Sequence, residues 1–150
     1  MLVGLIADTH GLMRPEALKA LSGVDVILHA GDVGKQAVLD ALWAIAPVHA
    51  VRGNCDGDGA VLRDALHLQL DGVQFHLSHG HELGSPTPAA LAAQYQADVI
   101  VYGHTHRALV THVGPTLVIN PGAAGPPRFD LKPSVGLVTL PSLETRIVLL

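Results

Sequence analysis

The N-terminal third of the chain alternates between apolar runs and helical segments, and this alternation restricts the possible folds more than any other feature. The runs at 2–7, 24–29 and 48–51 have the continuous apolar character of strands that are buried on both faces. Helical spacing occupies 15–21 and 35–45 between them. Strands that alternate with helices in this way pair in parallel through right-handed crossovers. The sequence therefore predicts an α/β protein.

Short strands and turns dominate the rest of the chain. Apolar runs at 66–70 and 73–77 flank Asp71-Gly72, a dipeptide that is typical of tight β-hairpin turns. A helix is expected at 86–96 and a strand at 98–102. Further short strands are expected at 108–113, 116–119, 135–140 and 145–149, with an irregular loop at 121–133. Because no repeat, low-complexity tract or linker divides the sequence, we expect a single domain over residues 1–150.

The composition restricts the compartment and the partners. The 150-residue chain is 49% hydrophobic, but no apolar run approaches the roughly 20 residues that span a bilayer. The N-terminus has the pattern of a strand rather than a signal peptide, and the single cysteine excludes an internal disulfide. We therefore expect a cytoplasmic protein with no membrane partner. The formal net charge is −4 and the nine Lys and Arg residues are scattered singly, which argues against long nucleic acid as a ligand.

Polar side chains follow the apolar runs at the point where each run ends. After the run that closes at Gly103, His104 and His106 are separated by one residue, and residues two apart in an extended segment point the same way. The other runs are followed by Asp8 and His10, by Asp32, by Asn54 and by His79. The carboxyl ends of strands form the ligand-binding edge of an open α/β sheet. We therefore expect these seven side chains to lie close together.

These seven side chains have the composition of a metal centre. They exceed the four ligands of one tetrahedral Zn²⁺, but they suit two divalent ions if one carboxylate bridges them. The mixture of carboxylate, carboxamide and imidazole favours Mn²⁺ and is compatible with Zn²⁺, Fe²⁺, Co²⁺ or Ni²⁺. Two such ions with two aspartates leave a local excess of positive charge on an otherwise acidic protein. A small phosphate ester is therefore the expected substrate, because its oxygens are anionic.

Five motifs occur in a fixed order along the chain, namely ADTHG, GDVG, GNCD, SHGH and YGHTH. In this order they resemble the motifs of the calcineurin-like metallophosphoesterases, and more narrowly those of the small bacterial and archaeal YfcE-type phosphodiesterases. The resemblance covers nearly the whole chain, and NPGAAG is similar to the NPGS turn of that branch. It implies a four-layer α/β/β/α sandwich with two mixed β-sheets and a metal site at the C-terminal ends of the strands.

The resemblance also implies roles for individual residues. The first ion would be held by Asp8, His10 and His106, the second by Asn54, His79 and His104, and Asp32 would bridge the two. The implied reaction is hydrolysis of a phosphodiester or monoester by a metal-bridging hydroxide. The candidate catalytic residues are Asn54, Cys55, Asp56 and His79.

Cys55 is a departure from the pattern of many family members. They carry at this position a histidine that is proposed to protonate the leaving group. A thiol of ordinary pKa, about 8.5, is a weaker proton donor. We therefore expect modest turnover and a preference for substrates with good leaving groups.

Two other functions are compatible with the sequence. The retromer subunit of the same fold is thought to act mainly as a binding module, so a catalytically silent protein-binding scaffold is one alternative. Every metal-ligand position of the motifs is occupied by a suitable residue in this sequence, which favours the enzyme over the scaffold. A hydrolase specific for a cyclic nucleotide or a dinucleotide is the other alternative. The apolar composition and the late strands are compatible with a homodimer or homotetramer.

Structural roles are expected for most polar residues outside the motifs. Asp8 and Asp32 have helix N-caps as an alternative role. Trp43 is expected to pack in the core, and Arg52 to form a surface ion pair. His81 is either structural or a contact to the substrate. The remaining histidines, expected to be structural, are His29, His49, His67, His76 and His112.

Overall fold

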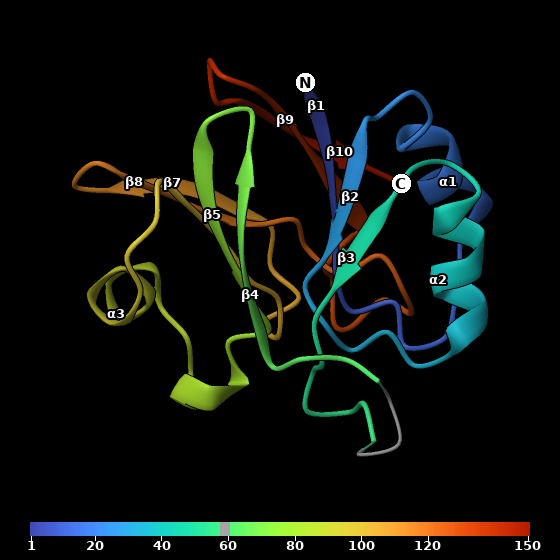
Figure 1. Ribbon diagram of the computed structural model, residues 1–150. Helices are drawn as coiled ribbons and strands as arrows, with labels where there is room; N and C mark the ends of the chain where they lie inside the picture. Colours follow the sequence, from blue (N-terminus) through green and yellow to red (C-terminus); the bar gives the residue numbers. More distant parts are fainter. Residues whose placement is uncertain (58–60) are drawn as a thin grey trace.

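Two five-stranded sheets pack face to face in the computed structural model, which describes residues 1–57 and 61–150 (Figure 1). The strand order of the first sheet is β10 (Glu144–Leu149), β9 (Ser134–Thr139), β1 (Leu2–Ile6), β2 (Val26–His29) and β3 (Val48–Ala50). The order of the second is β4 (Ala65–Leu70), β5 (Val73–Ser78), β6 (Val99–Val101), β8 (Thr116–Asn120) and β7 (Leu109–Val113). Each sheet contains both parallel and antiparallel pairs, so both are mixed.

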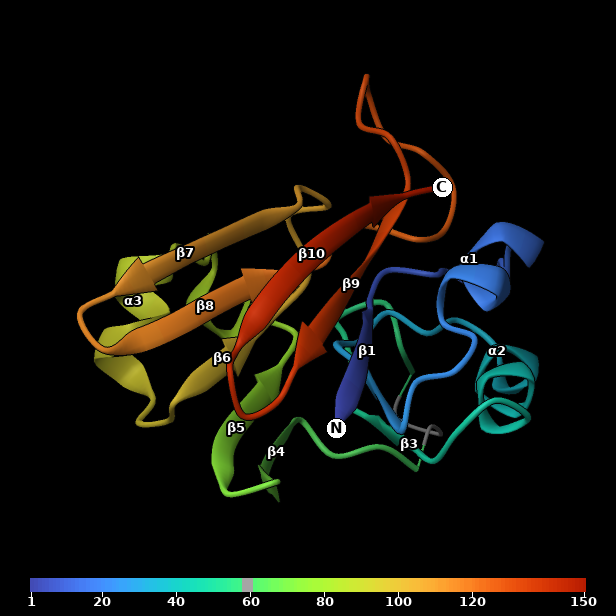
Figure 2. The same cartoon turned by 90° about the horizontal axis from the view of Figure 1, so that it is seen from above.

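Helices cover the outer faces of the two sheets (Figure 2). Helices α1 (Pro15–Ala20) and α2 (Gln36–Trp43) belong to an apolar cluster with the outer side chains of the first sheet. Helix α3 (Pro88–Gln94) packs through Leu91 on the outer face of the second, and a short 3₁₀ helix, η1 (His81–Leu83), precedes it. The layers therefore run α/β/β/α, which confirms the predicted fold class.

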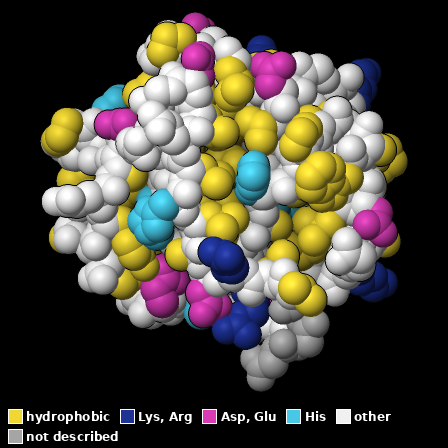
Figure 3. All heavy atoms as spheres, in the orientation of Figure 1, with side chains coloured by type: hydrophobic (Ala, Val, Ile, Leu, Met, Phe, Trp, Pro, Cys, Tyr) yellow, Lys and Arg dark blue, Asp and Glu magenta, His cyan; other side chains and the backbone are white. Residues whose placement is uncertain are grey.

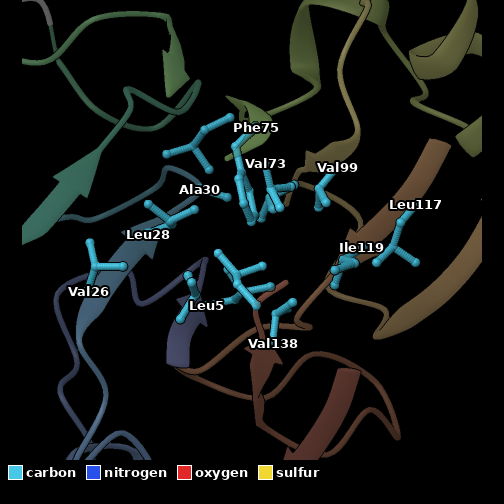
Figure 4. Packing of buried hydrophobic residues seen from close by; sticks show 14 of the residues in the cluster. Leu5, Val26, Leu28, Ala30, Val73, Phe75, Val99, Leu117, Ile119 and Val138 are labelled. Atoms are coloured by element: carbon cyan, nitrogen blue, oxygen red, sulfur yellow. The ribbon is translucent and has the colours of Figure 1, made fainter. Parts of the chain in front are cut away.

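The main core lies between the two sheets. Figure 4 shows Leu5 and Leu28 from the first sheet opposite Phe75 and Ile119 from the second, and these four side chains are at most 1% exposed. Each fully buried side chain of this size contributes roughly 1.5–3 kcal/mol. The polar residues that end these strands are thereby anchored to a rigid double sheet.

The hairpin prediction is confirmed in detail. Strands β4 and β5 pair with Leu70 opposite Val73, so that Asp71 and Gly72 form the turn. Both turn residues have positive φ, 47° and 79°. Such a turn matches the twist of the flanking strands and favours an Asp-Gly pair.

The prediction for Trp43 is wrong, since its side chain is 56% exposed. Helix α2 buries Val38, Leu39 and Leu42. At about 100° per residue, Trp43 lies about 100° from Leu42 and about 140° from Val38 around the helix, so it is outside the centre of the buried face. Exposed hydrophobic side chains gather on the face of the molecule that Figure 3 presents, which carries the edge strands β3 and β4.

The helix expected at 86–96 is also shorter than predicted. Helix α3 begins at Pro88, with the Thr87 side chain accepting a hydrogen bond from the N–H of Ala90 as an N-cap. It ends before Tyr95, whose backbone is extended. Among the described residues, no helix has the length and apolar character needed to cross a membrane.

Two fully buried histidines lie within the sheets and predict a loss of stability in acid. His29 is hydrogen-bonded to the Thr9 hydroxyl (3.0 Å) and His76 to the Ser78 hydroxyl (2.9 Å). Burial lowers the pKa of each to about 4. Between pH 6.5 and pH 4 these histidines are protonated in the unfolded chain but stay neutral in the folded chain. The free energy of unfolding therefore falls as the pH drops from about 6.5 towards 4, by up to about 3 kcal/mol per histidine.

Urea unfolding of the metal-free protein at pH 7.5 and pH 4.5 measures this effect. His76→Gln should lose part of the difference between the two pH values, because one of the two groups is gone. The control is His49→Gln, on the partly buried edge strand β3, which should keep the full difference. A His76→Gln protein with the same pH dependence as the wild type would contradict the expectation.

Candidate metal centre

The seven predicted side chains meet at one edge of the double sheet. The C-terminal ends of β1, β2 and β3 in the first sheet and of β5 and β6 in the second lie together, at the lower side of Figure 1. A hydrogen bond from backbone to side chain joins the two strand ends there, because the N–H of His104 donates to Asp8 Oδ2 (3.1 Å). This bond brings together the segments that follow β1 and β6, since Asp8 and His104 are 96 residues apart in the chain.

Asp8 is at the centre of the cluster. Its Oδ1 atom lies 3.4 Å from His106 Nε2, 3.8 Å from His10 Nε2 and 3.8 Å from His79 Nε2. Its side chain is fully buried, and Oδ1 has no hydrogen-bond partner among the described residues. A buried carboxylate oxygen that faces three imidazoles without a hydrogen bond is costly unless a cation compensates it.

Asp32 lies between the two halves of the cluster. Its Oδ2 atom is 3.7 Å from His10 Nε2 and 3.3 Å from His79 Nε2, and its Oδ1 accepts a hydrogen bond from the N–H of Cys55 (2.8 Å). Asn54 joins through its Oδ1 atom, 3.1 Å from His104 Nδ1. Donor atoms of Asp8, His10 and His106, and separately of Asp8, Asp32 and His79, all lie within 4.8 Å of one another.

Five of the seven residues have left-handed backbone conformations. The φ angles of Asp8, His10, Asp32, His104 and His106 lie between 46° and 72°. Such angles are rare for residues with a Cβ atom and persist where the surrounding structure imposes them, commonly at functional sites. The conformation turns each side chain off the line of its strand and into the cluster.

Two glycines allow the strand-end loops to approach so closely. A Cβ atom on Gly53 would overlap Oδ1 and the backbone nitrogen of Asp32, and one on Gly103 would lie 2.9 Å from Asp8 Oδ2. Neither Asp8 nor Asp32 caps a helix, because the N-cap residues are Arg14 for α1 and Lys35 for α2. Their carboxylates face the cluster instead.

The charges of the cluster shift its pKa values in opposite directions. Burial alone would raise the pKa of Asp32, but the His79 imidazole and the Cys55 N–H outweigh burial and hold it well below its usual range. Burial opposes protonation of His79, yet Asp32 and Asp8 together raise its pKa. Burial and the charge of His79 lower the pKa of His104. The site thus combines an ionised carboxylate with imidazoles in a small volume.

The donor set fits divalent cations. His79 donates from Nδ1 to the Ala30 carbonyl (2.7 Å), which leaves Nε2, a buried atom without a hydrogen bond, to face Asp8 and Asp32. A histidine that ligates a metal through one nitrogen commonly donates from the other in this way. With the unpartnered Asp8 Oδ1, these atoms have the arrangement of ligands around a positive charge.

A hydrogen-bonded clamp that the sequence did not suggest supports the loop after β5. Glu82 accepts from the Gly80 N–H (3.0 Å) and from the Tyr95 hydroxyl (2.7 Å). These bonds offset burial and lower the pKa of Glu82, while burial and Glu82 raise the pKa of Tyr95 to about 12. Tyr95 at the end of α3 therefore fixes the backbone next to His79.

Tyr95→Phe should loosen this loop. Loss of one partly exposed, charge-assisted hydrogen bond is expected to cost about 1 kcal/mol of stability. It should also weaken metal binding about threefold, well below the 10- to 100-fold effect of residues that contact ligands directly. Urea unfolding and calorimetric titration with Mn²⁺ measure the two effects. Gln96→Ala, at an exposed position nearby, is the control. Unchanged metal affinity in Tyr95→Phe would exclude a role of the clamp in metal binding.

The loop after β3 holds the remaining candidates. Cys55 is exposed, with donor atoms of Cys55, His10 and Asp32 within 4.8 Å of one another. Burial and the nearby Asp32 raise the pKa of its thiol, so it is protonated at neutral pH. Asp56 accepts hydrogen bonds from the N–H groups of Val33 (3.2 Å), Gly34 (3.0 Å) and Gly53 (2.9 Å). Its carboxylate therefore ties this loop to the loop after β2.

The polar residues outside the motifs lie in an ion pair, beside the cluster or within the sheets. Arg52 forms an ion pair with Asp64 (2.8 Å), as predicted. His81 lies beside the cluster, with its ring centre 5.4 Å from that of His79 and 6.4 Å from that of His104. His29 and His76 are buried and hydrogen-bonded to hydroxyls, so they have the predicted structural role.

The fold and the site together define a class: an α/β/β/α sandwich that presents carboxylates, an amide and imidazoles at its strand ends. Residues 1–142 match the calcineurin-like phosphoesterase superfamily domain. The chain belongs to this superfamily, which confirms the resemblance of its motifs.

Individual relatives agree with this assignment. The chain is 32% identical to a protein of Methanocaldococcus jannaschii named as a probable metallophosphoesterase, over 99% of this chain and 81% of the relative. It is also 32% identical to the phosphodiesterase YfcE of Escherichia coli, over 88% of this chain and 84% of YfcE. The fold is similar to that of Entamoeba histolytica Vps29 in complex with Zn²⁺, with a TM-score of 0.82 and 28% identity over 98% of this chain and 90% of Vps29.

Proposed function

We propose that the protein is a dinuclear metal-dependent phosphodiesterase that hydrolyses small phosphate esters. The observation that carries this proposal is the meeting of Asp8 and Asp32 with His10, His79 and His106, at distances of 3.3–3.8 Å. Membership in a superfamily of phosphoesterases and the similarity to YfcE support it.

The ligands would divide between two cations. Asp8, His10 and His106 would hold the first, Asn54, His79 and His104 the second, and Asp32 would bridge them. The contacts of Asp32 with both His10 and His79 support a bridging position. Mn²⁺ is the favoured ion, because carboxylate and amide oxygens accompany the imidazoles. When bound, the cations would activate a water nucleophile and bind phosphoryl oxygens.

The residues of the chain would orient the reactants. The cluster forms an open edge at which a phosphate can enter, since His10, Asn54 and His104 are not fully buried. Cys55, an exposed thiol close to His10 and Asp32, would stand close to the leaving group as a weak proton donor. Esters with good leaving groups should therefore be hydrolysed best, and diesters with aryl leaving groups are the preferred probes.

A protein-binding scaffold is the second candidate function. It is favoured by one observation, the similarity of the fold to Vps29. The Zn²⁺ complex of that neighbour indicates that metal binding alone does not separate the two functions. Turnover is therefore the discriminating property.

Elemental analysis of the purified protein, combined with hydrolysis assays, tests the proposal. Bis(p-nitrophenyl) phosphate and p-nitrophenyl phosphate should be compared with and without added Mn²⁺. We expect about two divalent ions per chain and hydrolysis that is abolished by a chelator and restored by Mn²⁺, with the diester as the better substrate. Full metal occupancy without turnover of either ester would favour the scaffold.

A further inference from the structure

A groove lies next to the metal centre on the side of Cys55. Its volume is about 420 Å³, within the range of pockets that bind small molecules. Cys55 and Asp56 form the wall shared with the metal centre. A second part of the lining comes from the loop after β2 and the first turn of α2, namely Val33, Gly34, Lys35, Gln36 and Leu39, and the described lining also includes Gly57, Val61 and Leu62. A substrate whose phosphate is held at the strand ends can thus extend past Cys55 into this groove.

Lys35 is held close to the cluster. A Cβ atom on Gly11, the residue after His10, would lie 3.1–3.2 Å from Cγ, Cδ and Cε of Lys35. The aliphatic part of Lys35 therefore lies against the backbone of Gly11, and that backbone is joined to the loop after β2 by a hydrogen bond from the Gly11 N–H to the Val33 carbonyl (2.8 Å). Lys35 is also one of the residues that line the groove.

Lys35 forms no ion pair with any residue that the structure describes. Within residues 1–57 and 61–150, no carboxylate lies within 4.0 Å of its ammonium group. Asp56, the acidic residue of the lining, is engaged by three backbone N–H groups, which offset its charge. Val33 and Leu39 add apolar surface to the same groove. The groove therefore combines an apolar wall with an available cation.

We propose that this groove is a leaving-group subsite for phosphate esters whose leaving group combines an apolar or aromatic body with a second negative charge. The body would pack against Val33 and Leu39, and the charge would pair with Lys35. This inference rests on the proposed function, since it assumes that the reacting phosphate binds at the cations. It makes Lys35 a residue that determines specificity rather than a part of the hydrolytic chemistry.

Calorimetric titration of the Mn²⁺-loaded protein with two non-hydrolysable ligands tests the proposal. The ligands are 4-carboxybenzylphosphonate and 4-carbamoylbenzylphosphonate, which have the same shape and differ in one charge. The wild type should bind the carboxylate about two- to fivefold more tightly, the range of one exposed ion pair. Lys35→Met should bind both ligands equally, and Lys35→Arg, which keeps the charge, should retain the preference. Lys19→Met, on the exposed end of α1, is the matched control and should retain it too.

The outcomes separate the two proposals. If both phosphonates bind the wild type equally, or if Lys35→Met keeps the preference, the subsite is overturned and the metal centre is unaffected. If neither phosphonate binds while two ions are present, the anion site of the proposed function fails, and the subsite fails with it. A preference for the carboxylate that Lys35→Met removes at unchanged metal content supports the subsite, whether or not esters are hydrolysed.

Discussion

Asp32→Ala should abolish hydrolysis of bis(p-nitrophenyl) phosphate and reduce the metal content of the purified protein. The carboxylate of Asp32 lies 3.7 Å from His10 Nε2 and 3.3 Å from His79 Nε2, so it faces both halves of the cluster. Its removal takes away the negative charge best placed to bring two cations together. Because the cations supply several kcal/mol of transition-state stabilisation, kcat/KM should fall by about three orders of magnitude or more.

The control for this variant is Asp40→Ala. Asp40 lies on α2, where its carboxylate accepts a hydrogen bond from the exposed Gln36 side chain (3.1 Å), so the same change of charge is made away from the cluster. Activity and metal content of Asp40→Ala should match those of the wild type. An Asp32→Ala protein that keeps two ions and full turnover would refute the assignment of Asp32.

Gly53→Ala should have the second large effect, on both metal binding and stability. The added methyl group would overlap the carboxylate and the backbone nitrogen of Asp32, and neither can move without disturbing the loop after β2. Forcing a methyl group into such a contact typically costs 1–3 kcal/mol. The displaced Asp32 should also weaken metal binding by about 10- to 100-fold. Urea unfolding of the metal-free protein and calorimetric titration with Mn²⁺ separate the two effects.

Gly57→Ala provides a matched control within the same loop. A Cβ atom on Gly57 would meet no atom of the described residues within 4 Å, so this substitution tests the change of residue type without the overlap. Its stability should stay within about 0.5 kcal/mol of the wild type, as is usual for surface substitutions. If the two variants bind Mn²⁺ equally well, close packing of Gly53 on Asp32 is not what positions the carboxylate.

Local patterns in the sequence predicted the elements that carry the site. Asp8, Asp32, Asn54 and His79 each follow an apolar run, and that rule alone placed them at one edge of the sheets. The Asp71-Gly72 turn was equally readable, because both positions need a positive φ that this pair tolerates. Such features depend on residues that are adjacent in the chain, so they can be predicted from the sequence.

Features that depend on contacts between distant segments were predicted wrongly or not predicted at all. Trp43 was expected in the core, but the face of α2 that packs in the folded protein is the one with Val38, Leu39 and Leu42, and Trp43 is 56% exposed. The clamp between Glu82 and Tyr95 joins residues 13 apart with no motif around them. The packing of Lys35 on Gly11 likewise depends on two loops that meet only in the folded protein.

The sequence by itself determined the class of fold, the edge on which the site lies and the chemical types of its donors, because periodicity and strand ends are properties of short segments. The tertiary structure alone decided that Asp8 faces three imidazoles and that Asp32 stands between His10 and His79. It also decided that a groove lined by Lys35 opens on the side of Cys55. The physical reason is that these distances depend on how two sheets pack across a shared core, and packing depends on all of the contacting side chains at once.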